Sequence, residues 1–142
     1  MIAYLERKNA GIPHPYNSHQ NDVVREYILS RVSDIAESSS YTEVFDDLTS
    51  NVTFGSGETA SYFEGSNILV RINGSDTNSE SKGVLFSAHF DSVSTAPGAT
   101  DDGMGVATLI QLVTYFSEHR PKRTVVFNIN NGEEDGLYGA HA

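Results

Sequence analysis

Three short clusters of side chains that bind metals or transfer protons lie in the second half of the sequence: His89-Phe90-Asp91, Asp101-Asp102 and Glu133-Glu134. Histidine nitrogens and carboxylate oxygens are ligands for zinc and other first-row divalent ions. A pair of carboxylates also suits hydrolysis, because one can bind metal while the other takes a proton from the attacking water. Together the clusters predict a site for metal-assisted hydrolysis.

Each cluster offers a specific role. A metal-bound histidine commonly donates its other ring N–H to a carboxylate, so Asp91 can serve His89 in this way. Asp101-Asp102 can supply a carboxylate that bridges two metal ions about 3.5–4 Å apart. The two carboxylates of Glu133-Glu134 repel each other unless a cation or a proton relieves them.

Each cluster taken alone also has a simpler interpretation. His89 and Asp91 can be a half-buried histidine and a surface aspartate. Asp101-Asp102 precedes Gly103-Met104-Gly105, and two carboxylates at a helix start can be caps that the helix dipole favours. Glu133-Glu134 can belong to a solvated acidic turn. The metal interpretation gains weight only when the three clusters are taken together.

The surrounding pattern brings the clusters to one place. Residues 84–88 and 124–130 are short apolar runs, typical of strands buried on both faces. A helix is expected over 103–118, with Pro121 closing it. Strand, helix and strand indicate a parallel pair with a right-handed crossover, which is α/β architecture. Ligands in such sheets bind beyond the carboxyl ends of the strands, where His89 and Glu133-Glu134 emerge.

The remaining elements are expected as follows. Asn21 or Asp22 can cap a helix that ends near Ser38–Ser40. Strands are expected over 41–48 and 67–72, a loop over 49–61, a polar turn over 73–82 and the start of a helix over 136–142. The length of 142 residues predicts one domain, covering 1–142.

Composition excludes several classes of function. The formal net charge is −10, with 19 acidic and 9 basic residues, which argues against binding of nucleic acid or anionic membranes. The absence of cysteine excludes disulfides and thiolate zinc sites. No apolar run is long enough to span a membrane, and no signal peptide is expected. Two N-glycosylation triplets occur, Asn51-Val52-Thr53 and Asn73-Gly74-Ser75.

The clusters lie in longer motifs that resemble a known family. The stretches S-A-H-F-D-S-V, P-G-A-T-D-D-G-M-G and N-x-N-N-G-E-E-D-G-L-Y-G-A are similar to those of the co-catalytic zinc aminopeptidases. The segments P-H-P-Y-N-S-H-Q-N-D, S-N-I-L-V-R-I and R-P-K-R-T resemble the lumenal peptidase domain of fungal vacuolar membrane proteases. The resemblance implies a three-layer α/β sandwich with a mainly parallel central sheet, truncated at the C-terminus.

The resemblance also implies roles around two zinc ions. His89 resembles a ligand of one zinc, Glu134 a ligand of the other and Asp101 the ligand that bridges them. The catalytic residues implied are Glu133, as general base, and Asp91, which orients His89. Asp102 is expected to be structural, with a cis peptide bond before it.

The family pattern includes two further ligands, an Asp and a His, which lie after the Glu-Glu motif. The chain is therefore expected to be the N-terminal part of a metallopeptidase domain, in which His141 lies too close to Glu134 to be the second histidine. The main expectation is a zinc metallopeptidase acting on peptides or proteins. The alternatives are a truncated or non-catalytic homologue, and a relative that became an aminoacyl transferase or cyclase.

The resemblance further implies location and partners. The expected location is the lumenal side of the vacuolar membrane, with attachment only through segments outside this chain. Self-association through exposed sheet edges is also expected.

Overall fold

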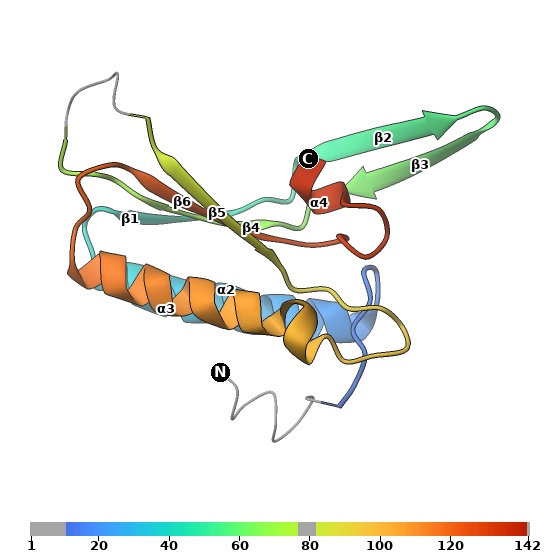
Figure 1. The fold of residues 1–142 in the computed structure, drawn as a ribbon, viewed down its shortest axis with the longest axis horizontal. Coiled ribbons are helices and arrows are strands. Elements are labelled where there is room, and N and C mark those ends of the chain that lie inside the picture. The colour runs from blue at the N-terminus through green and yellow to red at the C-terminus, as the bar shows by residue number, and fades with distance from the viewer. Residues whose placement is uncertain (1–10, 77–81, 142) are drawn as a thin grey trace.

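The computed structural model describes residues 11–76 and 82–141. One four-stranded sheet and two long helices make up most of it (Figure 1). The helices and strands are, in chain order, α2 (His19–Glu37), β1 (Thr42–Asp46), β2 (Asn51–Ser56), β3 (Thr59–Glu64), β4 (Ile68–Ile72), β5 (Val84–His89), α3 (Met104–Glu118), β6 (Val125–Asn130) and α4 (Tyr138–His141).

The main sheet has the strand order β1-β4-β6-β5. Strands β5 and β6 are parallel, and their register places His89 beside Asn130. The pairings of β4 with β1 and with β6 are antiparallel. The predicted α/β class and the parallel β5–β6 pair are therefore confirmed, but the sheet in the described residues is mixed rather than mainly parallel.

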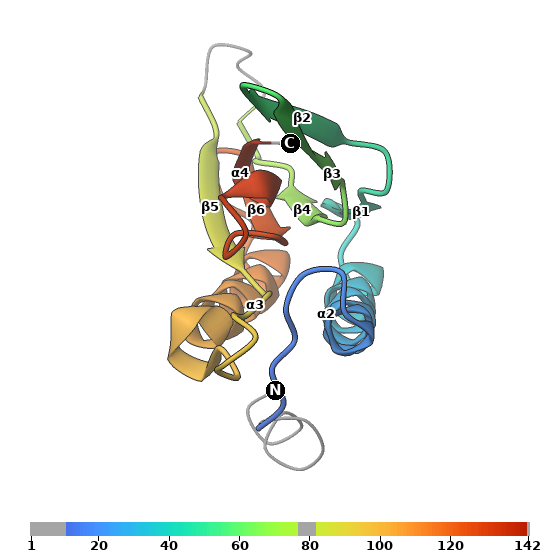
Figure 2. The same cartoon turned by 90° about the vertical axis from the view of Figure 1, so that its right-hand side faces the viewer.

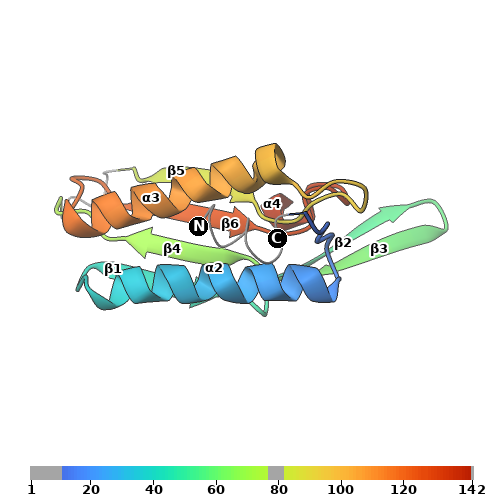
Figure 3. The same cartoon turned by 90° about the horizontal axis from the view of Figure 1, so that it is seen from below.

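Alternation along the strands decides where the core forms. Ile68, Val70 and Ile72 of β4 are fully buried, while Arg71 between them is exposed. The buried side chains face α2 and α3, which lie next to each other against one face of the sheet (Figures 2 and 3). The helices contribute apolar stripes at helical spacing: Val24, Ile28 and Val32 from α2, and Val106, Leu109, Ile110 and Val113 from α3.

Three expectations about the elements need correction. Helix α2 begins at His19 rather than after a cap at Asn21 or Asp22, because the Ser18 side chain caps it by accepting the backbone N–H of Asn21. Strand β5 lies at the edge of the sheet, so Val84 and Leu85 are 39% and 64% exposed rather than buried on both faces. An apolar run in the sequence does not distinguish an edge strand from a central one.

The third correction concerns residues 49–61, which were expected to form a loop. Most of them belong to the hairpin β2–β3, which projects away from the main sheet (Figure 1). Ser56 pairs with Thr59, so the connection has two residues, and Gly57 adopts a φ of 62°. A positive φ suits a glycine in a tight hairpin turn.

Aromatic rings attach the hairpin to the rest of the molecule. Phe63 of β3 is fully buried, and its ring centroid lies 5.1 Å from that of Tyr16 and 5.9 Å from that of Tyr138 in α4. Phe54 of β2 stacks on Tyr138 at 5.1 Å. The hairpin and α4 are thereby packed together just beyond the end of β6 (Figure 2).

Candidate metal centre

The end of β5 places His89 and Asp91 at the carboxyl edge of the parallel pair. His89 is the last residue of the strand, and the next residue, Phe90, still donates its backbone N–H to the carbonyl of Asn130 in β6. His89 is 7% exposed and Asp91 is 1% exposed. The predicted common edge is therefore present, and these two side chains are buried there rather than lying on the surface.

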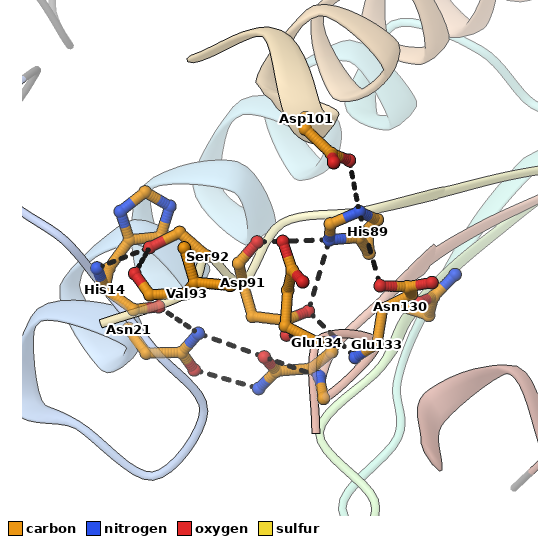
Figure 4. Close-up of polar contacts among 12 residues, drawn as sticks. His14, Asn21, His89, Asp91, Ser92, Val93, Asp101, Asn130, Glu133 and Glu134 are labelled. Atoms are coloured by element: carbon orange, nitrogen blue, oxygen red, sulfur yellow. Dashed lines mark hydrogen bonds and ion pairs between the residues drawn. The ribbon is translucent and has the colours of Figure 1, made fainter. Parts of the chain in front are cut away.

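The two ring nitrogens of His89 face different groups (Figure 4). Nε2 lies 3.1 Å from Asp101 Oδ1 and 3.8 Å from Glu133 Oε2. Nδ1 lies 3.1 Å from the backbone carbonyl of Asp91 and 3.5 Å from its carboxylate. A protonated His89 can therefore donate Nδ1–H to Asp91 and Nε2–H to Asp101. When the ring is neutral with its proton on Nδ1, Nε2 is free to bind a cation held by the same carboxylates.

Asp91 has a second function, which the sequence did not reveal. Its Oδ1 accepts the backbone N–H of Glu133 and its Oδ2 accepts that of Glu134, each at 3.1 Å. Burial alone would raise the pKa of Asp91, but hydrogen bonds from His89 and from these two amides hold it below the ordinary value. One buried carboxylate thus fixes both the histidine and the Glu133-Glu134 turn.

Glu133 and Glu134 follow β6 after a sharp bend. Gly132 has a φ of 73°, and a Cβ at this position would press on the Phe63 ring. One ligand atom from each of His89, Glu133 and Glu134 lies within 4.8 Å of the others. Burial raises the pKa of the half-buried Glu134 carboxyl, and the negative charge of Asp101 adds to the effect.

Asp101 reaches the same place from a turn, Ala99–Gly103, that leads into α3. Its side chain is 81% exposed. The peptide bond between Asp101 and Asp102 is cis, as the resemblance implied. Asp102 instead accepts the backbone N–H of Gly105 in the first turn of α3, which is the structural role expected of it.

All five predicted site residues therefore converge: His89, Asp91, Asp101, Glu133 and Glu134. The donor set consists of one imidazole nitrogen and carboxylate oxygens, which suits zinc or another divalent ion. The four carboxylates around one imidazole carry an excess of negative charge. The residues present therefore fit a bound cation.

Comparison with known proteins gives the family. The model of peptidase family M28 matches residues 67–142, which is more than half of the chain. The chain belongs to peptidase family M28. The matched region of this M28 chain contains all three clusters that the sequence had singled out.

Relatives with high identity carry a more specific name. The chain is 65% identical over 130 residues to a vacuolar membrane protease of Laccaria bicolor, covering 92% of this chain and 13% of the relative. It is 50% identical over 136 residues to a vacuolar membrane protease of Schizosaccharomyces pombe, covering 94% of this chain and 16% of the relative. This M28 chain thus spans about 13–16% of the length of these relatives.

Solved structures support the fold. LapB from Legionella pneumophila has a TM-score of 0.71 at 16% identity, covering 97% of this chain and 35% of LapB. A Zn-dependent exopeptidase from Parabacteroides distasonis has a TM-score of 0.64 at 20% identity, with coverages of 96% and 46%. A glutaminyl cyclase from Macrostomum lignano has a TM-score of 0.61 at 20% identity, with coverages of 84% and 34%. These likenesses show that the M28 chain shares their fold.

Several residues around the M28 site were not foreseen. Asn21, Asn67 and Asn131 are all at most 3% exposed and hydrogen-bonded to one another or to the site's backbone. Their only signal in the sequence is membership of the quoted motifs. His119 and His141 lie away from the site, stacked on Tyr115 and set edge-on to Phe54. In the part of the chain that the structure describes, no helix is long and apolar enough to cross a membrane.

Proposed function

We propose that the chain forms part of a metallopeptidase that uses two zinc ions to hydrolyse peptide bonds. The observation that carries the proposal is the position of His89. Its Nε2 lies 3.1 Å from Asp101, and one potential ligand atom each of His89, Glu133 and Glu134 lies within 4.8 Å of the others. In this proposal His89, Asp101 and Glu134 are the metal ligands, with Asp101 shared between the two ions. Bound zinc would polarise the peptide carbonyl and lower the pKa of water.

Glu133 is the proposed general base. Its carboxylate is half-buried and lies 3.8 Å from His89 Nε2. From this position it can take a proton from the attacking water and return it to the leaving amine. Its backbone N–H donates to Asp91 at 3.1 Å, so the main chain that carries the base is held in place before substrate arrives.

The finer parts of the assignment follow the relatives. Proteins at 50–65% identity are named vacuolar membrane proteases, so we place the chain on the lumenal side of a vacuolar membrane with peptides or proteins as substrates. The triplet at Asn51 lies on an exposed part of β2, which is compatible with glycosylation there. The fold also occurs in a glutaminyl cyclase, so the reaction must be tested on the site itself.

The test is hydrolysis of a panel of aminoacyl-coumarin amides by the zinc-loaded chain. Glu133→Gln is expected to lower kcat by at least about 100-fold, the range typical of a general base, while zinc affinity is retained. Asp135→Asn, which changes an exposed acidic neighbour, is the matched control and is expected to keep the activity. Equal activity in Glu133→Gln and the parent would refute the mechanism. Zinc uptake without hydrolysis would instead favour a non-catalytic homologue.

A further inference from the structure

Asn21, in the first turn of α2, is linked by hydrogen bonds to both segments that carry the site, the one after β5 and the one after β6. Its side chain is 2% exposed and belongs to a segment of the sequence, 13–22, to which the proposed mechanism gives no task. Nδ2 of Asn21 donates to Asn131 Oδ1 at 3.0 Å and to the carbonyl of His14 at 3.1 Å. Oδ1 of Asn21 accepts from Asn131 Nδ2 at 2.9 Å.

The first branch leads to the Glu133-Glu134 turn. Asn131 is 2% exposed and directly follows β6. Besides its reciprocal pair with Asn21, its amide donates to Ser66 Oγ at 2.8 Å and accepts the backbone N–H of Gly132 at 3.1 Å. Every hydrogen-bonding site of this amide is therefore used. The orientation of Asn131 fixes where the chain bends toward Glu133.

The second branch leads to Asp91. The backbone N–H of His14 donates to Ser92 Oγ at 2.9 Å, and Ser92 N–H lies 3.4 Å from the His14 carbonyl that Asn21 also contacts. Ser92 is 1% exposed and directly follows Asp91. Asn21 is thus connected, through His14, to the segment that carries the buried carboxylate.

The two branches meet again at the site. Asp91 accepts the backbone N–H groups of Glu133 and Glu134. Together with the main chain between neighbouring residues, these hydrogen bonds form a closed ring. It runs from Asn21 through Asn131 to the two glutamates, then through Asp91, Ser92 and His14 back to Asn21 (Figure 4 labels most of its members). The Asn21–Asn131 bonds join residues 110 positions apart in the chain.

We infer, building on the metal site proposed above, that Asn21 is a positioning residue. Through its hydrogen bonds to Asn131 and His14 it holds the Glu133-Glu134 turn in place against Asp91. A buried amide pair satisfies its hydrogen bonds in few orientations, whereas an apolar pair would tolerate sliding. The helix α2 supplies a rigid support, because Asn21 is anchored by its own backbone bond to the Ser18 cap. The segment 13–22 therefore helps to hold the site residues in place.

The test compares Asn21→Ala with Thr42→Val in the metal-free chain. Thr42 is the matched control, because its hydroxyl is also buried but is hydrogen-bonded to Ser39 and Ser117 at the far end of the sheet. Amide hydrogen exchange, measured by NMR, is expected to rise at least about ten-fold for Glu133 and Glu134 in Asn21→Ala, more than for Phe127 in β6. Thr42→Val is expected to change these amides no more than the rest of the sheet.

A second variant guards against a general loss of folding. Asn21→Asp keeps an acceptor for Asn131 Nδ2, removes the two donated bonds, and places a carboxylate where the start of a helix favours it. It is expected to raise exchange at Glu133 and Glu134 selectively while α2 stays folded. Zinc affinity should fall about ten-fold in both Asn21 variants, as for other residues that hold metal ligands in place.

The outcomes separate this inference from the proposed function. If the parent binds zinc and both Asn21 variants leave exchange and zinc affinity unchanged, the positioning role is overturned and the metal site stands. If the parent takes up no zinc but exchange at Glu133 and Glu134 rises selectively, the positioning role stands and the metallopeptidase proposal fails. An equal response in Thr42→Val would also overturn the role of Asn21.

Discussion

His89 lies between Asp91, Asp101 and Glu133, so its protonation governs the site when no metal is bound. The hydrogen bond to Asp91 raises the pKa of His89 to about 9 from 6.5. Burial opposes the rise, and the charges of Asp91 and Glu133 and a hydrogen bond to Asp101 support it. The protonated His89 therefore contributes its full stabilisation of the folded state below pH 6.5, and this stabilisation is lost as the pH rises through 9. The difference corresponds to on the order of 3 kcal/mol.

Urea unfolding of the metal-free chain at pH 6 and pH 9 measures this effect. The parent is expected to be less stable at pH 9, and His89→Gln should lose most of the difference. His119→Gln, at an exposed histidine stacked on Tyr115, should retain it. Stability that is flat over this range in the parent would show that Asp91 does not hold a protonated His89. Because zinc needs the neutral ring, its affinity should rise over the same range.

The candidate ligands could be predicted from the sequence, whereas the residues that hold them in place could not. His89, Asp101 and Glu134 stand in short motifs at strand ends or a helix start, so the sequence predicted that they meet at one edge of the sheet. Their roles as metal ligands came from the family resemblance and stay a prediction. Asn21 and His14 act through contacts that span 110 and 78 residues. Such contacts depend on how α2 packs beside the end of β6, which no local pattern encodes.

At the scale of elements, the central strands β4 and β6 were predictable and the hairpin β2–β3 was not. Strands β4 and β6 alternate or concentrate apolar residues because they line the core. The hairpin has Phe63 as its buried apolar residue and packs mainly through aromatic rings on Tyr16 and Tyr138. Its sequence therefore looks like a polar loop, and the Ser-Gly dipeptide at its turn was its clearest signal.

The short helix α4 is tightly fitted to the site's supports, which gives a prediction about Gly139. A Cβ at this position would press on the main chain of Asn131 and the side chain of Asn67, and Asn67 Nδ2 donates to the Gly139 carbonyl at 2.8 Å. Gly139→Ala is expected to lower the free energy of unfolding by about 1–3 kcal/mol. Urea unfolding of the metal-free chain is the measurement.

Gly55→Ala is the matched control, since a Cβ there meets nothing within 4 Å. It is expected to be neutral, or to stabilise by about 0.4–1 kcal/mol through the unfolded chain. Equal effects of the two substitutions would mean that Asn67 and Asn131 do not enclose Gly139 in solution.

At the scale of the whole molecule, the mixed sheet leaves β5 paired on one side in the described part of the chain. Leu85 on this strand is 64% exposed. Edge strands with exposed apolar residues promote association, so the chain is expected to form dimers or larger species as its concentration rises. Leu85→Lys should shift the population toward monomer in sedimentation velocity.

Leu48→Lys serves as the control for surface charge, because Leu48 is 63% exposed but lies in the connection after β1. It is expected to leave the association unchanged. A parent chain that stays monomeric at all concentrations would exclude association through the β5 edge. Association weakened equally by both substitutions would point to net charge instead.

Calorimetric titration of zinc into the metal-free chain at neutral pH tests the proposed metal site of His89, Asp101 and Glu134 most directly. Saturable binding with release of protons is predicted, because the protonated His89 must lose its proton to bind metal. His89→Gln and Glu134→Gln should each weaken binding at least about ten-fold, and Asp135→Asn should not. No saturable uptake, or equal binding by the parent and the three variants, would contradict a metal site at these residues.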